Sequence, residues 1–103
     1  MTTYRRVVLV GALLAIGSWA QAQAMDALQV RGMAAACAGC HGTRALTPSG
    51  YPSLAGVSRD ELLKKMLDFK TGAQTATLMH QISRGYSDEQ LDALAAYFSA
   101  QKK

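Results

Sequence analysis

The clearest hydrophobic pattern in the chain lies near its end. Over residues 88–100, apolar side chains recur at positions i, i+3, i+4 and i+7, the spacing of an α-helix with one buried face. These side chains are Leu91, Leu94, Ala95 and Phe98. Ser87 and Gln90 stand three residues apart, as the capping box that would open such a helix. We therefore expect the chain to close with an amphipathic helix.

A second helix is expected over residues 26–36, which are rich in alanine. Asp26 can cap its first turn. Gly32 lies inside this stretch, where glycine costs about 1 kcal/mol relative to alanine. Close packing would justify the glycine, so we expect the C-terminal helix to cross there. A helix that is simply loosened at Gly32 is the alternative.

The middle of the chain predicts two further helices. One begins at a capping box of Ser58 and Glu61 and runs to about Lys70, just before Gly72. Its charged side chains, Lys70 included, are expected to face water. The other is a short helix over residues 78–84. Because no stretch alternates as a strand does, the predicted fold class is all-α, with about four short helices.

Residues 1–24 have the features of a cleaved secretory signal peptide. Arg5 and Arg6 precede an apolar run, and residues 22–24 form a small-x-small cleavage motif. The apolar run is shorter than the ~20 residues that span a bilayer. We expect cleavage after this motif, export to the periplasm and no stable membrane insertion. The mature protein would then be one domain, residues 25–103.

The charge of the chain argues against one class of function. The formal net charge is +4 over the whole sequence. Loss of the signal peptide would leave nine basic and seven acidic residues, a net charge of +2. Binding to nucleic acid therefore has no electrostatic support.

The strongest chemical signal is the segment Cys37-Ala38-Gly39-Cys40-His41. Its spacing is the attachment signature of a c-type haem. The two thiols can each add to one vinyl group of a porphyrin, and the histidine can bind the iron as the proximal ligand. A redox-active disulfide would leave His41 unexplained, and a zinc site would lack ligands. We expect one covalently attached haem c, held by Cys37 and Cys40.

The second axial ligand decides whether the iron is open for catalysis or filled for electron transfer. Met79 is the expected ligand, because it lies far enough after His41 for the chain to pass to the other haem face. His80 is the rival. Adjacent helical residues point about 100° apart, so only one of the two can reach the iron. Met25 and Met33 are placed less well for this role.

The proximal histidine also needs a partner within the protein. A metal-bound histidine is oriented by an acceptor for its other ring nitrogen. Residues 42–56 form a loop with several glycines and prolines. We expect a carbonyl near Pro48 or Pro52 to accept from His41. Tyr51 and Leu54 are expected to cover the haem edge, and ordinary core packing is the alternative for both.

These motifs together resemble the class I cytochromes c, and within them the c4-like domains. The matching segments are residues 37–42, 51–56, 69–72, Met79 and 94–98. Residues 79–90 are similar to the cytochrome subunit of flavocytochrome c, the sulfide dehydrogenase. The resemblance implies Cys37 and Cys40 as thioether anchors and His41 and Met79 as the axial pair. It departs from many members in having one haem domain and no Gly-Pro step after His41.

The function expected is one-electron transfer in the periplasm, without enzymatic activity of its own. The resemblance implies a haem subunit that accepts electrons from a flavoprotein sulfide dehydrogenase. The alternative is a free soluble c4/c5-like shuttle to an oxidase, a reductase or a photosynthetic chain. A haem sensor or peroxidase would need an open iron position, against which Met79 argues. The uncharged residues Ala36, Ala38, Gly39 and Leu78 are expected to form the docking surface.

Overall fold

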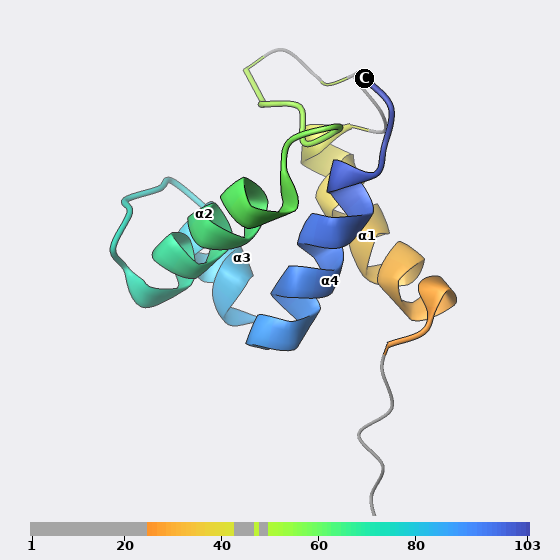
Figure 1. Ribbon diagram of the computed structural model, residues 1–103. Coiled ribbons are helices and arrows are strands. Elements are labelled where there is room, and N and C mark those ends of the chain that lie inside the picture. The colour runs from red at the N-terminus through yellow and green to blue at the C-terminus, as the bar shows by residue number, and fades with distance from the viewer. Residues whose placement is uncertain (1–24, 43–46, 48–49) are drawn as a thin grey trace, which may run out of the picture.

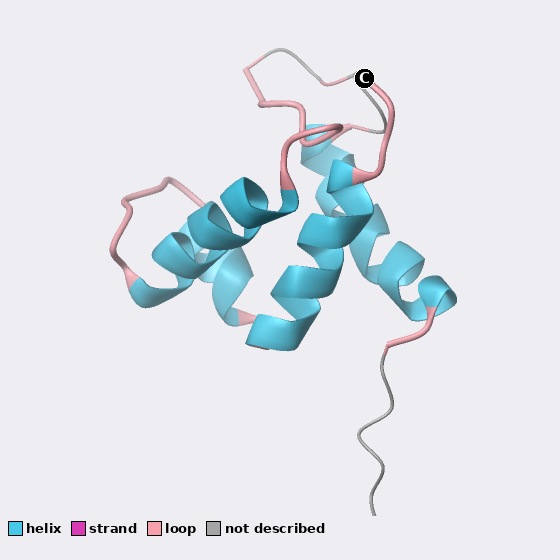
Figure 2. Ribbon diagram, viewed as in Figure 1, coloured by secondary structure: helices cyan, strands magenta, loops and turns pink. Residues whose placement is uncertain are grey.

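The computed structural model describes residues 25–42, 47 and 50–103, which contain four helices and no strand (Figures 1 and 2). This confirms the all-α class. The helices are α1 (Ala27–His41), α2 (Arg59–Thr71), α3 (Met79–Arg84) and α4 (Asp88–Ser99). The expected signal peptide, residues 1–24, and Pro48 lie outside the described residues.

Helix α1 begins as expected but ends later. The carboxylate of Asp26 accepts from the Gln29 amide at 2.8 Å, and the Gln29 side chain accepts from the Asp26 amide at 3.1 Å. The expected end at Ala36 is wrong, because the helix continues to His41. Gly42 ends it with a φ of 73°, a conformation that glycine adopts without strain. One helix therefore carries both cysteines and the histidine.

Helix α4 lies between α1 and α2 and contacts both (Figure 1). Its predicted apolar stripe is buried, and Leu91 is fully so, with 0% of its surface exposed. Three of these side chains join Ala34 of α1 and Leu62 of α2 in one core cluster. The prediction that the C-terminal helix crosses the first helix is therefore confirmed.

The expected crossing point at Gly32 is wrong. Gly32 is exposed, and a Cβ built on it would meet no atom within 4 Å. Ala34, two residues later, takes the buried position instead and is 2% exposed. The small side chain that close packing requires is thus an alanine.

Two charged contacts fasten α2 to α4, one near each end of α2. Arg59 donates to both carboxylate oxygens of Asp92, from Nε at 2.7 Å and from Nη2 at 2.5 Å. Lys70 donates to the Tyr86 carbonyl at 2.8 Å and to Asp88 at 2.7 Å. The expectation that Lys70 faces water is therefore wrong.

The two expected capping boxes differ in outcome. Ser87 and Gln90 form the complete box at the start of α4, each side chain accepting from the other's amide. At the start of α2, Ser58 accepts from the Glu61 amide at 3.3 Å. The Glu61 carboxylate instead pairs with Lys65 at 3.2 Å, one turn along the helix.

We predict that Leu91→Ala lowers the free energy of unfolding by about 2–5 kcal/mol, the usual cost of truncating a buried leucine. Leu28→Ala is the matched control. Leu28 is 77% exposed, so the change should stay within about 0.5 kcal/mol. Guanidinium unfolding of the haem-loaded protein measures both. Equal effects of the two substitutions would contradict the packing of α4.

The Arg59–Asp92 pair predicts a pH-dependent stability. The hydrogen bonds from Arg59 lower the pKa of Asp92 below its ordinary value of 3.8. A carboxyl group with a lowered folded-state pKa stabilises the protein above its unfolded-state pKa, and this contribution is lost as the pH falls through the folded-state pKa.

Asp92→Asn should therefore lower Tm at pH 7 by up to a few degrees, as expected for an exposed ion pair. The difference from the wild-type protein should shrink below about pH 4. In an Arg59→Gln background, the same substitution should have little further effect at either pH. A Tm difference that stays constant with pH would contradict this account.

Candidate haem-binding site

The last turns of α1 bring together three of the four expected site residues. Cys37 and His41 are four residues apart, so they share one face of the helix, and Cys40 lies next to that face. All three side chains are half-buried. Both thiols are free, so the disulfide considered from the sequence is not formed. The helix thus presents two available thiols and an imidazole on neighbouring positions.

The Cys37 thiol lies in a more buried environment than an ordinary surface thiol. Burial raises its pKa, while a backbone hydrogen bond partly opposes the rise. That lowering hydrogen bond comes from the backbone of Cys37 itself. Separately, the thiol donates to the Met33 carbonyl at 4.0 Å. The Cys37 thiol therefore remains protonated at neutral pH.

The imidazole of His41 is held by the backbone of the following loop. Its Nδ1 lies 2.7 Å from the carbonyl oxygen of Pro52. Because a carbonyl can only accept, Nδ1 carries the hydrogen and Nε2 keeps its lone pair. This is the tautomer that a metal-binding histidine needs. The expectation of a carbonyl partner near Pro48 or Pro52 is confirmed for Pro52.

A tyrosine supports the same ring from its edge. The rings of Tyr51 and His41 meet in a T-shaped arrangement, with centroids 6.1 Å apart and planes at 79°. Tyr51 is 48% exposed, so it lies at the rim of the site. Leu54, by contrast, packs against the hydrophobic core. Of the two residues expected as apolar cover, only Tyr51 contacts the histidine.

The loop that holds His41 is itself fixed to the end of α4. The Gly56 amide donates to the Phe98 carbonyl at 3.1 Å, and Ala55 is 2% exposed. Gly56 has a φ of 69°, and a Cβ there would lie 3.0 Å from the side chain of Lys103. The backbone conformation therefore favours glycine at this position, whereas the flexible Lys103 side chain could move aside.

Met79 and His80 are the first two residues of α3, on a different element from His41. Helix α3 packs against α2, whereas α1 packs against α4. The candidate ligands therefore come from separate helices, α1 and α3, which pack on different partners (Figure 1). Met79 is half-buried, and Leu78 before it is 55% exposed.

The environment of His80 bears on whether the chain fits a haem. His80 is half-buried, and its Nδ1 is buried with no hydrogen-bond partner among the described residues. A buried polar atom without a partner costs free energy, so such atoms point to a partner that the protein chain does not supply. Together with two free thiols and the Nε2 lone pair of His41, this donor set fits a haem. It also keeps His80 as the rival of Met79.

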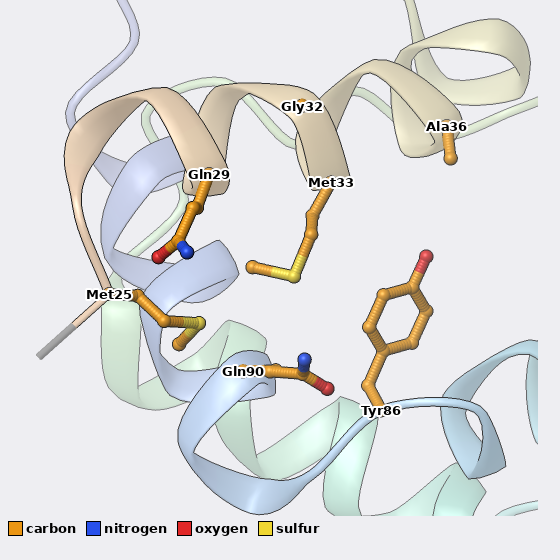
Figure 3. Close-up of a pocket in the computed structure, with 7 residues that line it drawn as sticks. All are labelled: Met25, Gln29, Gly32, Met33, Ala36, Tyr86 and Gln90. Carbon is orange, nitrogen blue, oxygen red and sulfur yellow. The ribbon is translucent and has the colours of Figure 1, made fainter. Parts of the chain in front are cut away.

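The two methionines that the sequence placed less well line a groove on the side of α1 that includes Ala36. The groove has a volume of about 610 Å³ and lies between α1 and the start of α4 (Figure 3). Met25 and Met33 enter it beside Tyr86 and Gln90, and Gly32 forms part of its wall. Gly32 thus borders an open groove, which is why nothing packs on it.

The described residues contain neither a metal-binding cluster of side chains nor a membrane-spanning helix. In the part of the chain that the structure describes, no group of three or more His, Cys, Asp or Glu side chains could hold a metal ion. Within the same described ranges, no helix is long and apolar enough to cross a bilayer.

A contact that sequence reasoning missed involves Lys70. This lysine was expected in water, but it connects the end of α2 with the corner between α3 and α4. One of its two acceptors is a backbone carbonyl, and any residue type supplies one. The sequence therefore contains no signal for this contact.

The comparisons with known proteins agree with this site. The sequence profile of the cytochrome c family matches residues 30–102. A cytochrome subunit of sulfide dehydrogenase from Chlorobaculum tepidum is 40% identical over 62 residues, which are 60% of this chain and 56% of that protein. A cytochrome c4 from Pseudomonas aeruginosa is 39% identical over 97 residues, which are 92% of this chain and 48% of that protein.

A third relative is of similar length. Cytochrome c-553 from Helicobacter pylori is 35% identical over 94 residues, which are 87% of this chain and 96% of that protein. The chain spans about half the length of the other two relatives. Cys37, Cys40 and His41 stand at the CxxCH positions within the matched region. The chain therefore belongs to the cytochrome c family, whose members carry covalently bound haem c.

Proposed function

We propose that this protein is a one-electron carrier in which Cys37 and Cys40 hold the haem through thioether bonds. His41 is the proximal ligand and Met79 the distal ligand of its iron. The observation that carries the proposal is the 2.7 Å contact from His41 Nδ1 to the Pro52 carbonyl. It orients the imidazole so that Nε2 can bind a metal, beside two free thiols on the same helix.

The haem supplies the one-electron chemistry, and the side chains set its conditions. His41 binds through Nε2 and is kept in one orientation by the loop carbonyl. A thioether from Met79 fills the second position and favours the reduced form relative to a second histidine. A filled position leaves no site for a substrate, which fits electron transfer rather than catalysis.

Met79 and His80 can be separated by substitution. Met79→Ala should open the iron, so that the reduced protein binds carbon monoxide and the oxidised protein loses its iron–sulfur charge-transfer band. Met79→His should lower the reduction potential by on the order of 0.1 V, within the roughly 0.8 V that axial ligands span. His80→Ala should leave the band intact. If His80 were the ligand instead, the oxidised wild-type protein would lack this band, and His80→Ala rather than Met79→Ala would allow carbon monoxide to bind.

We further propose that the electron donor is a flavoprotein that oxidises sulfide, with both proteins in the periplasm. Residues 79–90 and the relative from Chlorobaculum tepidum support this partner. The docking surface would be Leu78 with Ala36, Ala38 and Gly39. Leu78 is 55% exposed, and Ala36 and Gly39 are exposed as well.

The charges of the chain favour a docking surface of this kind. Four basic side chains of the described residues pair with carboxylates, in the ion pairs Arg59–Asp92, Lys64–Asp68, Lys65–Glu61 and Lys70–Asp88. Paired charges contribute less to long-range attraction of a partner. Association through apolar contact is then expected to depend little on salt.

A free shuttle is the second candidate. The relative from Helicobacter pylori matches this chain over nearly its whole length, so one domain of this size occurs as a separate cytochrome. A shuttle would leave its donor after each electron, whereas a subunit would remain bound.

The experiment is purification of the native protein from the periplasm, with flavin and haem measured together. A fixed ratio that survives moderate salt, and haem reduction on adding sulfide, would support the subunit. A cytochrome that elutes alone at every salt concentration would support the shuttle and exclude the subunit.

Leu78→Asp tests the docking surface. A charge at this position should slow haem reduction by the flavoprotein by about tenfold or more, because it would have to be desolvated in the contact. Leu28→Asp is the control, since Leu28 is 77% exposed on the first turns of α1, away from the cysteines. Equal rates in the two variants would refute the proposed surface.

A further inference from the structure

We propose that Lys70 is a positioning residue for Met79; this inference rests on the proposed ligation of the iron by Met79. Lys70 lies in the last turn of α2. Its ammonium donates to the Tyr86 carbonyl at 2.8 Å and to Asp88 Oδ1 at 2.7 Å. Its side chain is 27% exposed, against 76% for Lys64 on the same helix. The ammonium is thus held in place and is not free in solvent.

The two acceptors lie on the far side of the ligand segment. Tyr86 follows the end of α3, and Asp88 is the first residue of α4. Lys70 therefore closes a loop of chain that leaves α2, passes through Met79 and returns to α2 at the corner between α3 and α4. We call this contact the Lys70 clamp.

The rest of the ligand segment offers little support before Met79. Residues 71–78 are exposed apart from the half-buried Ala76. The Gln74 amide donates to the Asp68 carbonyl at 3.1 Å, which fixes only the start of the turn. Burial of this stretch therefore cannot decide where Met79 lies.

Helix α3 packs against α2, and its C-terminal end is the more firmly anchored part. Ser83 near that end is fully buried, and its hydroxyl donates within the helix to the His80 carbonyl at 3.4 Å. The Lys70 clamp lies three residues further on, at Tyr86. The short helix is thus fixed at its C-terminal end and extends back to Met79. A shift at that end would displace the whole helix and the thioether with it.

This dependence matters because a thioether is a neutral, weak ligand. Whether the Met79 sulfur stays bound to the iron depends more on how firmly the protein holds it in position than on the strength of the bond. A looser clamp should leave the fold intact and make Met79 easier to displace in the oxidised protein.

The test is Lys70→Met in the haem-loaded protein, which keeps the apolar stem and removes the ammonium. Imidazole titrated into the oxidised protein should bind about tenfold more tightly, the factor that corresponds to losing one charge-assisted hydrogen bond. The iron–sulfur charge-transfer band should weaken, and the reduction potential should fall. Lys70→Arg should keep the imidazole affinity, the band and the reduction potential near their wild-type values, because a guanidinium can reach both acceptors.

Two control variants remove other ion pairs of α2. Lys64→Met breaks the pair with Asp68 at 2.5 Å within the helix, and Arg59→Met breaks the pair with Asp92 that joins α2 to α4. Both should leave imidazole affinity and the band unchanged. If Arg59→Met raises imidazole affinity as much as Lys70→Met does, the effect is general destabilisation and the clamp is refuted.

Asp88→Asn gives a milder variant in case Lys70→Met does not fold. It keeps the Tyr86 carbonyl as acceptor, so it should raise imidazole affinity less than Lys70→Met. The double variant should resemble Lys70→Met alone, because both substitutions act on one contact. Additive effects would refute the clamp.

Met79→Ala distinguishes failure of the clamp from failure of the proposed ligation of the iron by Met79. If Met79→Ala leaves the charge-transfer band intact, the proposed ligation fails and the clamp fails with it. If Met79→Ala abolishes the band while Lys70→Met behaves like Lys64→Met, the ligation stands and the clamp alone is refuted.

Discussion

The hydrogen bond from His41 to the Pro52 carbonyl is the contact on which the site depends. At 2.7 Å it fixes both the tautomer and the direction of the imidazole. Without it, a histidine at the end of a helix could rotate about its side-chain bonds, and its Nε2 would have no defined position. The helix places the ring next to two thiols, and the loop carbonyl decides which nitrogen is available to a metal.

The remainder of the fold keeps that carbonyl in place. The loop is attached to α4 through Gly56 and Phe98, and α4 is attached to α1 through the core cluster around Ala34. His41 and its acceptor are therefore connected by two routes, along the chain and through α4. The proposed second ligand, Met79, would be held separately by the Lys70 clamp on α2. A small domain thus fixes its two axial candidates independently, with α4 as the common support.

The sequence predicted the parts of this structure that depend on side-chain identity. The apolar stripe of α4, the Asp26 and Ser87 caps and the CxxCH segment all follow from residue type at fixed spacing. Contacts to backbone carbonyls were harder to predict from the sequence, because every residue has a carbonyl. The acceptor of His41 could be narrowed to two prolines, but the acceptors of Lys70 could not be foreseen. Gly32 was misassigned because a glycine looks the same whether it borders another helix or an open groove.

The central claim is that the backbone of Pro52 orients the histidine that binds the iron. Its most direct test is nuclear magnetic resonance of the reduced, haem-loaded protein labelled with ¹³C and ¹⁵N. The account predicts a proton on His41 Nδ1 that exchanges slowly with water and shows a hydrogen-bond coupling to the Pro52 carbonyl carbon. An Nδ1 proton that exchanges as fast as in free imidazole, or couples to another carbonyl, would contradict it.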